Sequence, residues 1–382
     1  MKVYLDNAAT TKVHPKVIEK MLPYLDYYYG NPSSIHSFGR NARVAVEESR
    51  EIIADFINAD PSEIYFTSCG TESSNFIITG IAKTEFIESG KNHLVTSAGD
   101  HKATLKAIER LSENGFQSDI LKLDKKFKFE NNILNDSVSE KTSLISLIHV
   151  NNETGTTFHV KQIRENISNV YFHIDAVQSF GKINLDVKDL GIDALSVSAH
   201  KLYGPKGIGA AFIKSGTPMN SLILGGGQER NRRAGTENVA SIVGFAEAVK
   251  IAKESMTENF ENVQQLKNYF WSGLIGNGIV GIFNNSKINS SPYILSLTLD
   301  PEIYQTDSEA TLMFLDINGI AVSAGSACTS GTLKPSHVIL AGGYSEAYAK
   351  GTIRFSFSTE NTIEELDYTI EVVKKLSKKL KK

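Results

Sequence analysis

A lysine that directly follows an apolar strand-like run is the residue of this sequence with the clearest chemical potential. The run begins at Leu195 and ends in Ser198, His200 and Lys201 follow, and a turn rich in glycine and proline comes next. A lysine withdrawn from water has a lowered pKa, so its free amine can form a Schiff base. Ser198 and His200 could bind an anionic group such as a phosphate. Taken alone, the pattern also fits a surface lysine that opens a loop.

Two further strand ends carry groups that suit a phosphate and a cationic ring. Gly70 and Thr71 lie between a predicted strand and a helix, where the unpaired N–H groups of the helix start can bind a phosphate. Asp175 ends an apolar strand, and a carboxylate there needs a cation or a donor such as a protonated ring nitrogen. An ordinary helix cap at Thr71 and a structural ion pair at Asp175 are the alternatives.

The histidines and cysteines give weaker signals. His101, His149 and His200 fall near strand ends, but a metal site needs three or four ligands with compatible spacing. His101 could instead stack on an aromatic ring and act as a general acid or base. Cys328 lies among small residues, which predicts an exposed and reactive thiol, whereas Cys69 at a tight turn is interpreted as a packing residue.

Strands that alternate with helices must position these groups. The pattern predicts an α/β fold in which a mostly parallel, seven-stranded sheet is flanked by helices. The predicted strands are residues 64–67, 94–96, 117–123, 143–150, 170–175, 194–198 and 209–213. In such sheets, ligands bind at the carboxyl ends of the strands. We expect a large domain at residues 15–254 and a smaller α+β domain, made of residues 1–14 and 255–382, that carries the segment with Cys328.

Composition excludes several classes of protein. Of the 382 residues, 41% are hydrophobic and 22% are charged, as in ordinary globular proteins, and the net charge of −3 does not favour direct binding of nucleic acid. The N-terminus lacks the apolar segment of a signal peptide, and no apolar run is long enough to span a membrane. Two cysteines cannot form a disulfide framework, so we expect a cytoplasmic protein.

Together, the strand-end residues fit pyridoxal 5′-phosphate. Lys201 would form the Schiff base, and Asp175 would keep the pyridine nitrogen protonated so that the ring accepts electrons. His101 would stack on the ring. The phosphate would be bound by Thr71 at the helix start beside Gly70 and by Ser198 and His200.

Nine motifs occur in a fixed order along essentially the whole chain. They are residues 4–11, 30–34 with His36, 66–68 with 70–73, 149–153, 173–178, 198–207, 233–236, 325–328 and 353–356. This series resembles the cysteine desulfurases, a branch of the class V aminotransferase group with the fold type I architecture of pyridoxal-phosphate-dependent transferases. The segment around Cys328 resembles the long type found in this family.

The resemblance implies further roles for individual residues. Asn152 and Gln178 would contact the cofactor, and Asn152 and Arg354 would hold the substrate carboxylate. Thr236 would reach the phosphate of the neighbouring subunit, which implies a homodimer with shared active sites. Cys328 would be the nucleophile, and a transient role for it as an iron–sulfur ligand is left open.

The resemblance also implies a reaction. Lys201 would remove the α-proton of L-cysteine, and the Cys328 thiolate would attack the substrate sulfur, which leaves a persulfide on Cys328 and releases L-alanine. His101 would handle the thiol protons. The sulfur acceptor would be an iron–sulfur scaffold protein or a tRNA-thiolation enzyme.

Three other functions remain open at this point. A selenocysteine lyase would share the cofactor site, and its relative rates on cysteine and selenocysteine would identify it. An aminotransferase would not need Cys328 and would release a keto acid. A non-enzymatic partner of a sulfur system would lack a bound chromophore.

Overall fold

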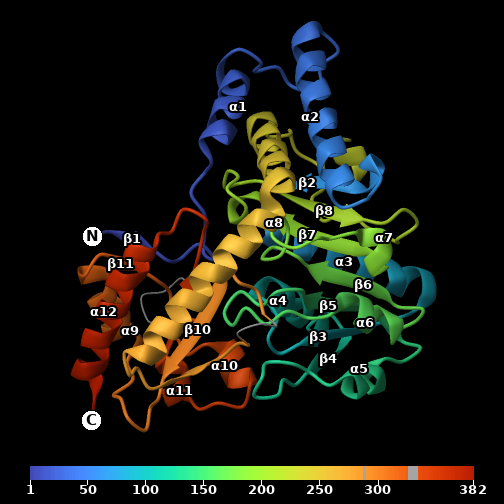
Figure 1. Ribbon diagram of the computed structural model, residues 1–382. Coiled ribbons are helices and arrows are strands. Elements are labelled where there is room, and N and C mark those ends of the chain that lie inside the picture. Colours follow the sequence, from blue (N-terminus) through green and yellow to red (C-terminus); the bar gives the residue numbers. More distant parts are fainter. Residues whose placement is uncertain (287–289, 326–333) are drawn as a thin grey trace.

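A seven-stranded sheet is the centre of the computed structural model, which describes residues 1–286, 290–325 and 334–382 (Figure 1). The strands, in their order across the sheet, are β2 (Ile64–Thr67), β8 (Gly209–Ile213), β7 (Ala194–Ser198), β6 (Tyr171–Asp175), β5 (Thr142–Ile148), β3 (His93–Ser97) and β4 (Gln117–Leu121). All neighbours from β7 to β4 are parallel, and β8 is antiparallel to both β2 and β7. The predicted mostly parallel, seven-stranded sheet is therefore confirmed.

Helices cover both faces of this sheet because its strands are apolar on both sides. On one face, α3 (Gly70–Ser89) and α4 (Lys102–Ser112) pack around a core that includes Phe76 and Ile108. On the other, α2 (Ser37–Phe56), α6 (Val160–Glu165) and α7 (Val187–Leu190) join a larger core. The result is a three-layer sandwich in which the carboxyl ends of β3, β5, β6 and β7 share one edge.

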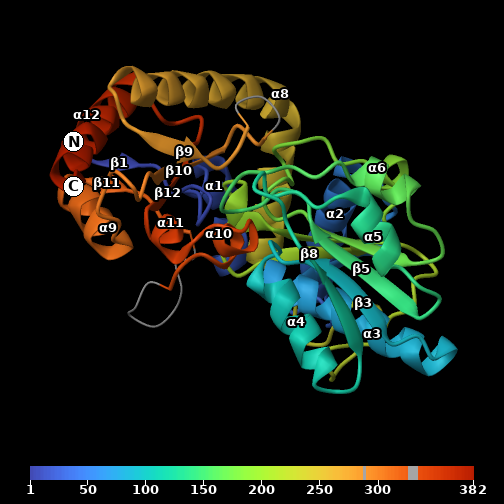
Figure 2. The same ribbon diagram turned by 90° about the horizontal axis from the view of Figure 1, so that it is seen from below.

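A smaller α+β unit packs beside this edge (Figure 2). Its antiparallel sheet has the order β12 (Thr352–Ser356), β10 (Ile294–Leu299) and β9 (Gly281–Phe283). The N-terminal strand β1 (Val3–Tyr4) pairs in parallel with β11 (Ile320–Ala321) of the same unit. The other helices there are α9 (Ser308–Ile317), α10 (His337–Ala341), α11 (Glu346–Lys350) and α12 (Ile363–Leu380).

Helix α8 (Val239–Gly276) joins the two units, and its 38 residues contribute to both cores. Ala252 packs in the larger core and Val263 in the smaller one. The domain boundary that we predict at residue 254 lies between them and stays a prediction. Two short helices, α1 (Pro15–Asp26) and α5 (Asn131–Ser137), complete the set. Within the described ranges, no helix has the length and apolarity that crossing a membrane requires.

Candidate active site

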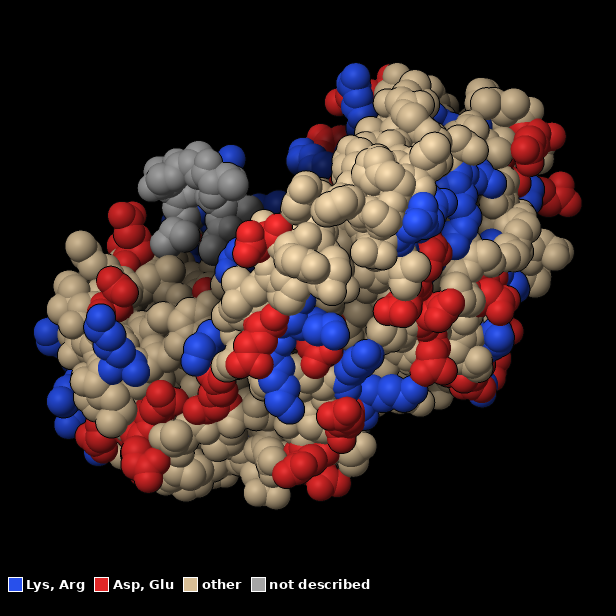
Figure 3. All heavy atoms as spheres, turned by 90° about the horizontal axis from the view of Figure 1, so that it is seen from above, with Lys and Arg blue, Asp and Glu red and all other residues tan. Residues whose placement is uncertain are grey.

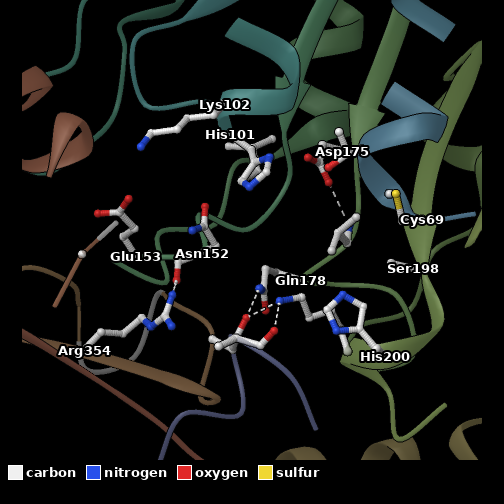
Figure 4. A pocket seen from close by; sticks show the side chains of 18 of the residues that line it. Cys69, His101, Lys102, Asn152, Glu153, Asp175, Gln178, Ser198, His200 and Arg354 are labelled. Carbon is white, nitrogen blue, oxygen red and sulfur yellow. Dashed lines mark hydrogen bonds between the residues drawn. The ribbon is translucent and has the colours of Figure 1, made fainter. Parts of the chain in front are cut away.

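One cavity of about 350 Å³ lies where the carboxyl ends of the strands meet the smaller unit (Figure 4). Ten of the twelve residues predicted for the site line it. They are Gly70, Thr71, His101, Asn152, Asp175, Gln178, Ser198, His200, Lys201 and Arg354. These residues are spread along the chain from position 70 to position 354, so only the fold brings them together.

Lys201 ends the short 3-10 helix Ala199–Lys201 that follows β7. Its Nζ donates to the carbonyl oxygens of Ala8 and Ala9, each at 2.6 Å, and the amide of Gln178 also donates to Ala8 at 2.9 Å. Burial, helped by the charges of Arg354 and Lys182, lowers the pKa of Lys201 to about 7. A substantial fraction of the amine is therefore neutral and nucleophilic near neutral pH.

Asp175 and His101 approach the same space from the carboxyl-terminal sides of β6 and β3, the two strands that flank β5 (Figure 4). Asp175 ends β6, and its Oδ1 accepts from the N–H of Val177 at 3.0 Å. Burial raises the pKa of Asp175, against the opposing effects of His101 and Lys201. The ring of His101 caps α4, since Nδ1 accepts from the N–H of Ala103 at 3.1 Å, and burial lowers its pKa. A neutral His101 consequently carries its proton on Nε2.

Another part of the cavity wall, on the side of Asp175, combines a helix N-terminus with hydroxyl and imidazole groups (Figure 4). Gly70 and Thr71 begin α3, and a Cβ on Gly70 would lie 2.6 Å from a methyl group of Val177, so glycine is needed there for packing. The hydroxyl of Ser198 is buried and has no hydrogen-bond partner among the described residues. Burial and the charge of Lys201 lower the pKa of His200 to about 4, so it can offer a hydrogen bond but no positive charge at neutral pH.

Arg354 enters the cavity from β12 of the smaller unit. Its Nη2 pairs with Oδ1 of Asp6 at 2.7 Å, and its Nη1 donates to the carbonyl of Asn152 at 2.9 Å. The Nε atom is buried and has no partner within the described part of the chain. These contacts hold the guanidinium group in one orientation and leave a donor for a carboxylate.

The two remaining predicted residues lie elsewhere. Thr236 lines a separate cavity of about 200 Å³ together with Thr67, Ser68 and Arg233. Its proposed contact with a neighbouring subunit stays a prediction. Cys328 lies outside the described residues. Cys69, interpreted from the sequence as a packing residue, is half-buried and lines the main cavity.

Sequence reasoning missed three charged or titratable groups at the site. Asp6 holds Arg354, while Glu153 and His337 line the cavity itself. Asp6 falls within the motif at residues 4–11, to which no role was assigned, and Glu153 falls within a motif whose role was assigned to Asn152. His337 follows a helix-capping serine far along the chain. Across residues 1–286, 290–325 and 334–382, no group of three or more His, Cys, Asp or Glu side chains could hold a metal ion.

Comparisons with known proteins show to which family the chain is similar. The model of the family "Aminotransferase class-V" matches residues 3–369. The cysteine desulfurase IscS of Dictyoglomus turgidum is 41% identical over 383 residues, which cover 100% of this chain and 95% of the relative. A solved structure described as a NifS-like protein has a TM-score of 0.91 at 36% identity and covers 100% of both chains. Another, described as SspA in complex with cysteine, has a TM-score of 0.82 at 34% identity and covers 94% of this chain and 100% of the other.

Proposed function

The chain belongs to the aminotransferase class-V family, and on that premise we propose that it is a pyridoxal-5′-phosphate-dependent cysteine desulfurase. The enzyme converts L-cysteine to L-alanine and retains the sulfur as a persulfide on Cys328. The observation that carries this proposal is the position of Lys201, a buried amine with a pKa of about 7 in a cavity shared with Asp175, His101 and Arg354. Full-length relatives with this activity support it.

The residues around the cavity fit the cofactor. Ser198 Oγ and Gln178 Oε1 are buried polar atoms that have no hydrogen-bond partner among the described residues, as expected of groups that bind a ligand. The first turn of α3 and Ser198 would hold the phosphate, with His200 as a neutral donor. Asp175 would hold the ring N–H, whose positive charge offsets the burial that raises the pKa of this carboxyl. Bound pyridoxal 5′-phosphate would supply an electron sink that makes the α-proton of the substrate acidic.

The chain's own groups then orient the substrate and move its protons. Arg354 would hold the carboxylate of L-cysteine through its unpaired Nε and one Nη atom, in the two-point geometry that arginine favours. Lys201 would accept the α-proton, because its neutral form is well populated near pH 7. His101 would exchange protons with the thiols, and the Cys328 thiolate would take the sulfur.

A homodimer is part of the proposal. Seen from above α1 and α2, the molecule presents a broad surface without Lys, Arg, Asp or Glu (Figure 3). Large exposed apolar side chains of this region are Ile18, Leu22, Leu25, Tyr27, Tyr29, Ile35 and Phe38. A patch of this kind favours burial against another protein surface. Light scattering should give twice the chain mass, and Leu25→Glu combined with Phe38→Glu should give a monomer.

The persulfide on Cys328 would supply sulfur to an iron–sulfur scaffold protein or to a tRNA-thiolation enzyme in the cytoplasm. The same proposal includes Cys328 as a transient ligand of an iron–sulfur cluster. Pull-down with the enzyme loaded with L-cysteine, compared with Cys328→Ser as the control, should enrich acceptor proteins only when the persulfide can form.

The activity is tested with purified protein and pyridoxal 5′-phosphate. We expect a visible absorption band that borohydride removes, and equal amounts of alanine and sulfide from L-cysteine in the presence of a thiol. Release of a keto acid would instead favour an aminotransferase, and activity confined to selenocysteine would favour a selenocysteine lyase. Absence of both chromophore and turnover would refute the proposal.

A further inference from the structure

His337 is a cavity-lining histidine whose orientation is fixed by its surroundings. It begins α10, and its Nε2 lies 3.0 Å from the carbonyl oxygen of Asp100. Because a backbone carbonyl can only accept, Nε2 carries the proton and donates. In the neutral ring, the lone pair is therefore on Nδ1, which is buried and has no hydrogen-bond partner among the described residues.

Glu153 faces this nitrogen from the loop after β5. Its side chain is 4% exposed, and Oε1 lies 3.9 Å from Nδ1 of His337. Its other oxygen, Oε2, accepts from the hydroxyl of Ser336. Ser336 also caps α10, because its Oγ accepts from the N–H of Ile339 at 3.2 Å. The same serine thus fixes both the carboxylate and the start of the helix that presents His337.

The two groups together offer two acceptors to a donor in the cavity. Nδ1 of His337 and Oε1 of Glu153 both accept, and at 3.9 Å they are too far apart for a direct hydrogen bond to each other. An S–H or O–H group between them would meet both acceptors. His337 and Glu153 therefore form a proton-accepting pair on the wall of the cavity.

The chemistry of the substrate indicates which of its groups would donate a proton to His337. L-cysteine has three polar groups: Arg354 accounts for the carboxylate, and the cofactor accounts for the amine. The thiol must lose its proton when its sulfur is transferred, and His337 and Glu153 line the same cavity as Arg354 and Lys201, which leaves His101 to exchange protons with the thiol of Cys328. We propose that His337 accepts the thiol proton of bound L-cysteine at Nδ1, with Glu153 as its positioning and charge-stabilising partner. This inference rests on the proposed function.

The proton balance of the reaction supports such a residue. When a thiolate takes the sulfur of L-cysteine, an S–S bond forms and the C–S bond breaks, with its electron pair passing to the carbon side. The S–H bond breaks as well, its electron pair stays on the transferred sulfur, and an N–H bond forms at His337. The methyl group of L-alanine gains one proton, so the number lost at sulfur equals the number gained at carbon. No oxidant or reductant is needed beyond the sulfur transfer itself. His337 holds the proton between these two events.

The test separates handling of the thiol from the rest of catalysis. His337→Gln keeps an N–H donor for the carbonyl of Asp100 but removes the basic nitrogen. In the holoenzyme, we expect the rate of alanine formation from L-cysteine to fall about 10- to 100-fold. Exchange of the α-proton of L-alanine with deuterated solvent needs no thiol, so it should stay within about twofold of wild type.

Two further variants sharpen the test. Glu153→Gln keeps an acceptor for Ser336 but removes the charge, so it should lower desulfuration about threefold to tenfold while it spares exchange. His337→Ala should regain activity when imidazole is added, whereas wild type should not respond. His159→Gln, at an exposed histidine, is the matched control and should behave as wild type.

The outcomes distinguish this inference from the proposed function. Desulfuration by His337→Gln within twofold of wild type, an equal fall in exchange and desulfuration, or no effect of imidazole on His337→Ala would each overturn the role of His337. Wild-type protein that exchanges L-alanine but releases no sulfide from L-cysteine would instead overturn the proposed function.

Discussion

Two lysines invite comparison, a half-buried one in the larger unit and a buried one in the smaller unit. Lys201 lies at the cavity, and Lys267 lies within α8 among the core residues of the smaller unit. Burial lowers the pKa of each to about 7. Lys267 is 0% exposed, and its Nζ donates to Oγ of Ser290 at 2.7 Å and to the carbonyl of Ser291 at 2.9 Å.

The difference between the two lies in their neighbours. Charged groups surround Lys201, since Arg354 and Lys182 lower its pKa while Asp6 and Asp175 oppose them. For Lys267, burial alone lowers the pKa. Lys267 joins α8 to the segment at Ser290 and Ser291, which contacts the turn after β5 through the bridge between Ser290 and Thr156. A lowered pKa therefore does not by itself identify a catalytic lysine. A catalytic lysine also lines an open cavity and has charged side chains of both signs around it.

The largest expected effect tests this distinction directly. Lys201→Ala should reduce alanine formation from L-cysteine by about 10⁴-fold or more, because both cofactor attachment and α-proton removal depend on this amine. Lys267→Met should retain activity within about threefold. Lys206→Ala, at an exposed lysine of the same turn as Lys201, is the control. If Lys201→Ala and Lys267→Met lost comparable amounts of alanine-forming activity, the two lysines would not differ in the way proposed.

The second largest effect concerns Arg354, the positive charge that faces Lys201 from the smaller unit. Arg354→Lys keeps a positive charge but loses the two-point grip on a carboxylate, so kcat/KM for L-cysteine should fall about 100-fold, mostly through KM. Steady-state kinetics and the absorption spectrum of the cofactor measure this. Asp6→Asn, which weakens the ion pair but keeps the guanidinium group of Arg354, should have a smaller effect. An unchanged KM in Arg354→Lys would mean that another group binds the carboxylate.

The sequence predicts the side of the site that contains Lys201 better than the opposite side. Parallel strands bring their carboxyl ends to one edge, so Asp175, Ser198 and Lys201 could be grouped from strand ends alone. Glu153 and Ser336 are 183 positions apart, and Asp6 and Arg354 are 348 apart. The first pair depends on how the smaller unit packs against the sheet, and the second on how the N-terminal segment packs within the smaller unit. No local sequence pattern encodes either contact.

The same reasoning explains what sequence reasoning missed in the fold. A long helix such as α8 has enough turns for a periodic apolar pattern, whereas α6, α7 and α10, of at most six residues each, have too few. Lys267 was missed as well, because a lysine in a helical pattern normally indicates the solvent-exposed face. Its burial follows from the packing of α8 against the smaller sheet.

A smaller effect concerns Lys182, which is buried and whose ammonium group lies 5.1 Å from the centre of the Tyr293 ring. Its charge lowers the pKa of Lys201, so Lys182→Met should raise that pKa. Less neutral amine would then be present at pH 7, and the rate at which apoenzyme captures pyridoxal 5′-phosphate should peak at higher pH. Lys188→Met, at an exposed lysine, should leave the profile in place. A profile shifted to lower pH would reverse the sign and contradict the electrostatic account.

The smallest effect on activity, but a distinct one on stability, belongs to Lys267. Its pKa is about 7 in the folded protein and has the ordinary value of about 10.4 in the unfolded chain. Between these values, the unfolded chain binds more protons, so this group makes the free energy of unfolding rise with pH, by at most about 1.4 kcal/mol per pH unit. Lys267→Met lacks this contribution, so urea unfolding from pH 7 to 9.5 should show wild type gaining stability relative to the variant. Lys250→Met, at an exposed lysine of the same helix, should keep a constant difference from wild type. If the wild-type and Lys267→Met curves run parallel, Lys267 is charged in the folded protein, and its resemblance to Lys201 disappears.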